Sequence, residues 1–153
     1  MYIGPTPQDQ PPLGTSYIQD ATTTAQINDV LNRMATDNLA KQLSCSYGMD
    51  INLSTIQIFQ QFAAQGQSFF LASGDSGAFT TAVNEPADDP YITIVGGTSL
   101  TTDTNGVYKS ETVWLTPADP ASGTPLQASG GGVSTAYPIP SWQQGIKIGR
   151  AHV

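Results

Sequence analysis

The residues best suited to chemistry lie in the segment 69–78, which reads FFLASGDSGA. An apolar run of this kind is typical of a buried parallel strand, and open α/β sheets bind their ligands beyond the carboxyl ends of such strands. Asp75 stands at that end between Gly74 and Gly77, which allow unusual backbone angles and a close approach to a ligand. Asp75 is therefore the leading candidate for a site residue.

A competing interpretation comes from the tetrapeptide Gly-Asp-Ser-Gly, which also surrounds the nucleophile of chymotrypsin-like proteases. A serine of that kind needs a histidine base placed earlier in the chain. The sequence holds one histidine, His152, near its far end. The alternation of helices and strands set out below does not suit a double β-barrel either, so Ser76 is interpreted as a turn residue.

Composition narrows the protein class and its partners. The chain has 153 residues, enough for one domain, and a net charge of −7 from 12 acidic and 5 basic side chains. It has no basic run, which argues against nucleic-acid partners and against a membrane partner. A pI near 4.1 with many hydroxyl and amide side chains resembles secreted proteins that work in acid. We therefore expect a secreted (extracellular) protein.

The last residues of the chain, 148–153, read IGRAHV. This is the translation of ATC GGA AGA GCA CAC GTC, a string that matches a very common sequencing adapter. We expect residues 148–153 to be adapter read-through and exclude them from fold reasoning, with a natural C-terminus as the alternative. On this interpretation His152 has no functional meaning.

Two segments have the apolar spacing of amphipathic helices. The first has a stripe that begins at Ile27, behind a predicted cap at Thr24. The second is predicted to begin with a capping box of Ser54 and Gln57 and to end at Gly66.

Apolar runs between and after these helices predict strands. Their order along the chain favours parallel pairing with right-handed crossovers and helices on both faces of the sheet. The segment 129–134, which contains three consecutive glycines, is interpreted as a surface turn. The sulfur of Cys45 is interpreted as part of a small buried hydrophobe, since no histidine accompanies it. The predicted strands are 42–46, 68–73 and 91–95, followed by a hairpin of 98–101 and 107–114.

Several short motifs occur in a fixed order, and together they are more specific than any one alone. They are SCSYG (44–48), ASGDSGA (72–78), PADDPYITIVGGTS (86–99), ETVW (111–114), SGGG (129–132) and PSWQ (140–143). In this order they resemble the sedolisin (serine-carboxyl) peptidases over about residues 20–147. The resemblance implies an α/β fold, a subtilisin-like three-layer αβα arrangement with a mostly parallel sheet, incomplete at both ends. Residues 1–147 would then be the central part of a peptidase catalytic domain.

The family resemblance also implies a catalytic set of a serine nucleophile, a glutamate base, a supporting aspartate and a separate oxyanion-hole aspartate. Only the last of these maps onto the chain, at Asp75. The helix with the base should lie before Met1 and the nucleophile segment after Trp142, so the fragment itself is expected to be inactive. Ser99 follows Gly97 and Thr98 in a sequence that mimics the nucleophile segment, but it is assigned to a different strand of the family.

The chemistry of an aspartate in an oxyanion hole is coherent. Acyl transfer builds negative charge on a carbonyl oxygen, which needs preorganised hydrogen-bond donors. An ionised carboxylate would repel that charge, so Asp75 would have to carry a proton, as a carboxyl group does in an acidic medium. The alternative role is a turn aspartate that caps a helix after Gly77.

Substrate contacts are expected from two segments by the same analogy. The first would offer an exposed strand edge to a peptide or protein substrate, and the second would form one wall of the P1 side-chain pocket. The alternative for the first segment is a strand end that leads into the next helix. The expected substrate-binding residues are Ser46, Tyr47, Gly48, Ala72, Ser73 and Gly74.

No metal or other cofactor is expected within this fragment. The calcium loop of the family lies near its C-terminus, so calcium is expected only in the complete protein, which should be a monomer. Asp88 and Asp89 are interpreted as a solvated loop pair, because calcium needs six or more oxygen ligands. The rival to a serine-type endopeptidase is a non-catalytic, peptidase-like binding module.

Overall fold

The computed structural model describes residues 21–80, 83 and 86–145, without the side chains of residues 21–23 and 142. The start of the predicted domain, residues 1–20, and the expected adapter read-through at 148–153 lie outside these ranges. Within them, no helix is both long and apolar enough to cross a membrane.

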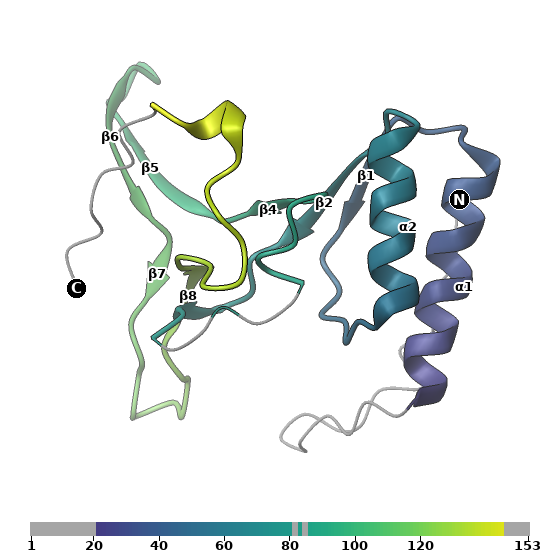
Figure 1. The fold of residues 1–153 in the computed structure, drawn as a ribbon. Coiled ribbons are helices and arrows are strands. Elements are labelled where there is room, and N and C mark those ends of the chain that lie inside the picture. The colour runs from purple at the N-terminus through teal and green to yellow at the C-terminus, as the bar shows by residue number, and fades with distance from the viewer. Residues whose placement is uncertain (1–20, 81–82, 84–85, 146–153) are drawn as a thin grey trace.

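Three parallel strands form the sheet that the candidate site depends on. They are β1 (Gln42–Cys45), β2 (Ser68–Ala72) and β4 (Thr93–Val95), in the order β1-β2-β4. Leu43 pairs with Phe69, and Leu71 pairs with Ile94, so all three strands end at the same edge of the sheet (Figure 1). The predicted strands and their parallel pairing are confirmed.

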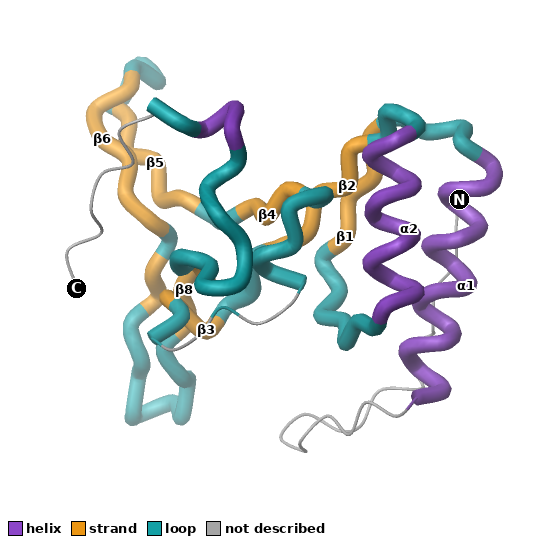
Figure 2. The backbone as a smooth tube through the Cα atoms, in the orientation of Figure 1, coloured by secondary structure: helices purple, strands orange, loops and turns teal. Residues whose placement is uncertain are grey.

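Two helices pack on this sheet in the order that Figures 1 and 2 show, with α2 (Leu53–Ala64) between the sheet and α1 (Ala21–Asp37). Both lie on the same side of the sheet, so the described residues do not supply the predicted helices on its other face. The buried core joins the two helices to β1 and β2. It consists of Ile27, Leu31, Ala35, Leu43, Met49, Ile58, Phe59, Phe62, Phe69 and Leu71.

Three phenylalanine rings form the centre of this core. Phe59 and Phe62 on α2 are fully buried, and Phe69 on β2 is nearly so. The rings of Phe62 and Phe69 are stacked with centroids 5.6 Å apart, and those of Phe59 and Phe69 lie 5.4 Å apart. Such pairs contribute about 0.5–1.5 kcal/mol each beyond the burial of their area. The aromatic cluster therefore fixes α2 directly on the strand that leads to Asp75.

The helix ends differ in detail from the prediction. α2 is capped by Asn52, whose side chain accepts hydrogen bonds from the backbone N–H groups of Ser54 and Thr55, while Thr55 Oγ1 accepts from Asn52 N. The predicted box of Ser54 and Gln57 is therefore wrong, because the cap lies two residues earlier, at Asn52. Thr24 lies within α1 rather than at its start. The predicted stop at Gly66 is confirmed by its φ of 71°.

The predicted hairpin is present as β5 (Thr98–Thr102) paired antiparallel with β6 (Tyr108–Val113). Asp103 closes its turn, since its carboxylate accepts hydrogen bonds from Asn105 N and Val107 N. Both strands of the hairpin are exposed along their whole length.

A second small sheet corrects the interpretation of the glycine-rich segment. Its strands are β3 (Ser76–Ala78), β7 (Leu115–Thr116) and β8 (Gln127–Gly131), in the order β3-β8-β7. Residues 129–131 are thus the end of a strand rather than a surface turn, and Ser129 is buried. The last regular element is a short 3-10 helix, η2 (Ser141–Gln143).

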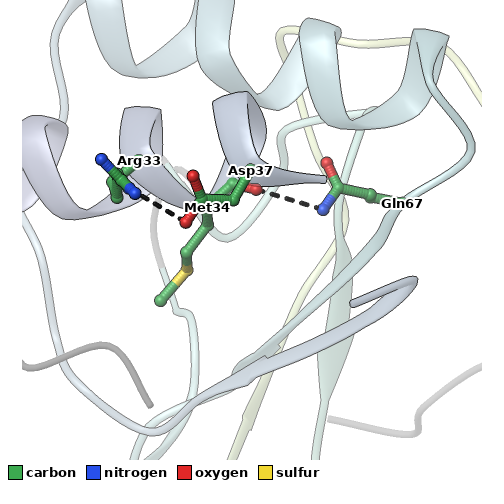
Figure 3. Close-up of polar contacts among 4 residues, drawn as sticks. All are labelled: Arg33, Met34, Asp37 and Gln67. Carbon is green, nitrogen blue, oxygen red and sulfur yellow. Dashed lines mark hydrogen bonds and ion pairs between the residues drawn. The ribbon is translucent and has the colours of Figure 1, made fainter. Parts of the chain in front are cut away.

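A buried glutamine joins α1 to the start of β2. Gln67 is 3% exposed, and its Nε2 donates hydrogen bonds to the carbonyl oxygens of Ala40 at 2.8 Å and Met34 at 3.4 Å. Figure 3 shows the bond to Met34 beside the ion pair of Arg33 and Asp37, whose atoms lie 2.9 Å apart. That ion pair is on the helix surface, where such pairs contribute little. Gln67 is the stronger tie because its own side chain is buried, so its hydrogen bonds do not compete with water as those of an exposed side chain do.

Replacing Gln67 with alanine should lower the free energy of unfolding by about 2 kcal/mol, because Ala40 loses its buried donor. Gln60, which is exposed on α2, provides the matched control. Gln60→Ala should change that free energy by less than about 0.5 kcal/mol. Urea unfolding of both variants measures the difference, and equal stabilities would show that Gln67 does not tie the two elements together.

Candidate active site

Asp75 lies in a turn that begins where β2 ends. Gly74 and Gly77 on either side of it have φ angles of 81° and 82°, in the left-handed region that favours glycine. The chain then enters β3 directly, so no helix follows Gly77 and the alternative role of Asp75 as a helix cap is wrong. The side chain of Asp75 is exposed.

The backbone of this turn is held from two sides. Ser73 N donates a hydrogen bond to the carbonyl of Val95 at 3.0 Å, which ties the turn to the end of β4. Ala128 N and Gly130 N, both on β8, donate to the carbonyl oxygens of Asp75 at 2.8 Å and Gly74 at 3.2 Å. The aspartate thus combines a fixed main chain with a side chain that can reach a ligand.

A groove of about 460 Å³ opens where the three parallel strands end. The predicted site residues Ser46 and Ala72 line it, together with residues that follow the other strands. The full lining is Ser44, Cys45, Ser46, Phe70, Leu71, Ala72, Val95, Gly96 and Gly97. This position, beyond the carboxyl ends of a parallel sheet, is where ligands bind in open α/β folds.

The remaining predicted residues are distributed around this groove. Ser73 lines a second hollow of about 270 Å³, which it shares with Gly96 and with the glycines at the end of β8. Tyr47 is half-buried and packs against the core, whereas Gly48 and Gly74 are exposed. The structure therefore places Ser46 with Ala72 but separates Ser73 from them.

The sequence alone does not predict the contributions of Gly96, Gly97 and Ser129. Ser129 Oγ accepts a hydrogen bond from Gly97 N at 2.6 Å and lies 2.9 Å from Gly97 O, to which it donates. Two glycines after a buried strand indicate that another part of the chain approaches closely there. The sequence does not indicate that this partner is Ser129 on β8.

The loop carboxylates Asp88 and Asp89 are not the solvated pair that the sequence suggested. Asp89 is only 4% exposed, and its Oδ1 accepts a hydrogen bond from Tyr91 N at 2.8 Å. Asp88 is half-buried, and Ser134 Oγ donates to its Oδ2 at 2.8 Å. The two carboxylates therefore shape their loop, and the described part of the chain holds no cluster of three or more metal-ligating side chains.

Electrostatic perturbation is found away from the groove, at Asp119. A hydrogen bond from the hydroxyl of Ser122, at 2.7 Å, and one from Ala121 N lower the pKa of this exposed carboxyl group. These bonds stabilise the loop that precedes β8, and none of them involves a candidate site residue.

Comparison with known proteins identifies relatives of the chain, although no family model matches it. Xanthomonalisin from Xanthomonas sp. (strain T-22) is 34% identical over 172 residues, covering 86% of this chain and 20% of that protein. Sedolisin from Pseudomonas sp. (strain 101) is 38% identical over 144 residues, covering 82% of the chain and 24% of that protein. The chain is a homologue of the sedolisin-family peptidases.

A solved structure supports the same relationship. Pseudomonas sedolisin, a serine-carboxyl proteinase complexed with two molecules of pseudo-iodotyrostatin, matches with a TM-score of 0.67 and 33% sequence identity. The match covers 82% of this chain and 39% of that one. The predicted sedolisin family and α/β fold are therefore confirmed. The chain spans about a quarter or less of the length of the two sedolisin-family relatives above.

The turn geometry predicts different responses from two exposed glycines near the groove. Gly74→Ala places a Cβ in open space but at a φ of 81°, so it should lower the free energy of unfolding by about 1–2 kcal/mol. Gly48→Ala is the control, because its Cβ also meets open space and its φ is not in that region. Urea unfolding of both variants should show a loss only for Gly74→Ala, and equal losses would contradict the assigned turn strain.

Proposed function

We propose that this chain forms part of the catalytic domain of a secreted, acid-acting serine-carboxyl peptidase in which Asp75 is an oxyanion-hole donor. One observation carries the proposal. Asp75 is exposed in the turn after β2, whose last residue, Ala72, lines the groove formed by three parallel strand ends, and the backbone of the turn is held on two sides. A fixed main chain under a solvent-accessible carboxyl group is what a preorganised donor requires.

The proposed reaction is peptide hydrolysis through an acyl-enzyme. A serine oxygen forms a bond to the carbonyl carbon of the substrate, its proton passes to a glutamate, and an electron pair moves to the carbonyl oxygen. A protonated Asp75 donates to that oxygen until the C–N bond breaks and the amine leaves with the proton. Water then hydrolyses the ester by the reverse sequence of steps.

Substrate binding is proposed along the edge of the sheet. Among the described strands β1 pairs only with β2, so its other side is available for β-augmentation by an extended peptide. Ser46 and Gly48 follow β1 and are exposed, and Ser46 lines the groove next to Ala72. The expected ligand is therefore a peptide or an unfolded segment of a protein.

The nucleophile and base are proposed to come from parts of the protein other than this chain. The sequence has two glutamates, Glu85 and Glu111. Glu85 lies outside the described residues, and Glu111 lies on the hairpin, where Thr98 Oγ1 donates to its carboxylate at 2.5 Å. Ser99 is also on the hairpin, paired with Thr112, rather than at the strand ends. The calcium site of the complete protein is likewise proposed to lie elsewhere.

The role of Asp75 is tested in the protein encoded by the full reading frame. Asp75→Ala removes the donor and should lower kcat by about 10²–10³ at acidic pH. Asp75→Asn keeps a donor that cannot ionise, so it should retain more activity and its alkaline limb should be set by other groups. Both effects are measured as rates for one peptide substrate from about pH 3 to 7, roughly the range in which carboxyl groups titrate.

Asp29→Ala is the control for that experiment, since Asp29 is an exposed aspartate on α1, away from the groove. It should leave the pH profile unchanged. If Asp75→Ala matches the parent at the acidic end, where the carboxyl group would be protonated and donating, Asp75 has no oxyanion role.

The isolated 153-residue chain should not hydrolyse casein at any pH, because it is proposed to lack both nucleophile and base. The protein from the full reading frame should hydrolyse casein in acid. Proteolysis by the purified chain that a serine-directed inhibitor abolishes would place the nucleophile within it. A full-length protein without activity would favour the non-catalytic binding module instead.

A further inference from the structure

We propose that β8 positions the Asp75 turn, with Gly130 and Ser129 as the residues through which it does so. The inference rests on the proposed function of Asp75. It goes beyond that function because it assigns a positioning role to residues outside the proposed catalytic set. These residues belong to the glycine-rich segment 129–134, whose sequence is typical of a surface turn.

The first support is the hydrogen bonding between β8 and the turn. Ala128 N and Gly130 N, two residues apart on one side of β8, donate to the consecutive carbonyl oxygens of Asp75 and Gly74. Phe79 N returns a bond to Gly131 O at 2.8 Å, beyond the other end of the turn. The main chain on both sides of Asp75 is therefore held by one strand.

The second support is the close approach of Gly130 to the end of β2. A Cβ added at Gly130 would lie 1.9 Å from the carbonyl oxygen of Ser73 and 2.9 Å from its carbonyl carbon. Both atoms belong to backbone, which cannot rotate aside as a side-chain end can. Any residue other than glycine must push β8 away from Ser73, and the hydrogen bond to Gly74 O, already 3.2 Å long, would be the first to weaken.

The third support is the hydroxyl of Ser129, which fixes β8 to the end of β4. Ser129 is 8% exposed, and its Oγ bonds to both the N–H and the carbonyl of Gly97. Ser129 N also donates to the carbonyl oxygen of Trp114, and the backbone N–H of Trp114 donates to Gly97 O. The strand that holds the turn is thus itself anchored to a residue that lines the groove.

Together these contacts make the position of the Asp75 carboxyl group depend on the spacing between β8 and β2. An oxyanion donor must lie within hydrogen-bond distance of the developing charge, and a displacement of about 1 Å can cost about 10²-fold in rate. A side chain at position 130 should therefore act on catalysis through Asp75, without any contact of its own with the substrate.

The test is a double-mutant cycle in the full-length protein, with kcat and KM measured for one peptide at acidic pH. Gly130→Ala is compared with Gly131→Ala, the matched control, because a Cβ at Gly131 meets nothing within 4 Å. Each substitution is made in the parent and in the Asp75→Ala background. Thermal unfolding of every variant shows whether it is folded at the assay temperature.

We expect Gly130→Ala to lower kcat by about 10²-fold in the parent. Gly131→Ala should change it by less than about twofold. In the Asp75→Ala background the further loss from Gly130→Ala should fall below about threefold, because the group that it displaces is already absent. Should Gly130→Ala prove unfolded, Ser129→Ala, which removes only the hydroxyl, replaces it in the same cycle with the same expected non-additivity.

Two results overturn the inference while leaving the role of Asp75 intact. In one, Asp75→Ala is impaired but Gly130→Ala behaves like Gly131→Ala. In the other, the losses from Gly130→Ala are equal in both backgrounds, which means general damage rather than positioning. Full activity of Asp75→Ala alone would instead contradict the proposed function, and the positioning role with it.

Discussion

The packing of α2 onto β2 is the interaction on which the rest of the structure depends. The rings of Phe59 and Phe62 on the helix enclose that of Phe69 on the strand, and β1 and β4 pair in parallel on either side. Because β2 is central in its sheet, fixing its position also fixes where all three strands end. The groove and the Asp75 turn both lie at that edge, so site geometry follows from an apolar contact on the helical side.

The second constraint is the junction between the two sheets. The chain leaves β2 through Gly74 and Asp75 and enters β3. There it pairs with β8, which lies more than fifty residues further along the sequence. Glycine at position 130 allows this junction to close, since any Cβ would overlap the carbonyl of Ser73. Stability and the proposed chemistry thus place different demands on neighbouring residues. The core requires the large rings of the phenylalanines, whereas the turn and its junction with β8 require glycine at positions 74, 77 and 130.

The sequence predicted the features that depend on local pattern. Apolar runs located β1, β2 and β4, Gly66 marked the end of α2, and the glycines around Asp75 announced its unusual turn. Features set by tertiary contact were not predictable in this way. Three glycines in a row are typical of a turn, yet the first two belong to β8, and the close approach of the Ser73 carbonyl explains why position 130 is a glycine. Likewise, the burial of Asp89 depends on the conformation of its loop, in which its carboxylate accepts a hydrogen bond from Tyr91 N. At the start of α2, both Asn52 and Ser54 are residue types that cap helices, and the structure shows that Asn52 is the cap.

The central claim is that Asp75 donates a hydrogen bond to the oxyanion, and the most direct measurement is a distance. A crystal structure of the full-length protein at acidic pH, with a peptide aldehyde bound covalently to the nucleophile, would place the tetrahedral oxygen. We predict a separation of about 2.7–3.1 Å between that oxygen and a carboxyl oxygen of Asp75. An Asp75 carboxyl group directed into solvent, with the tetrahedral oxygen held by other donors, would contradict the account.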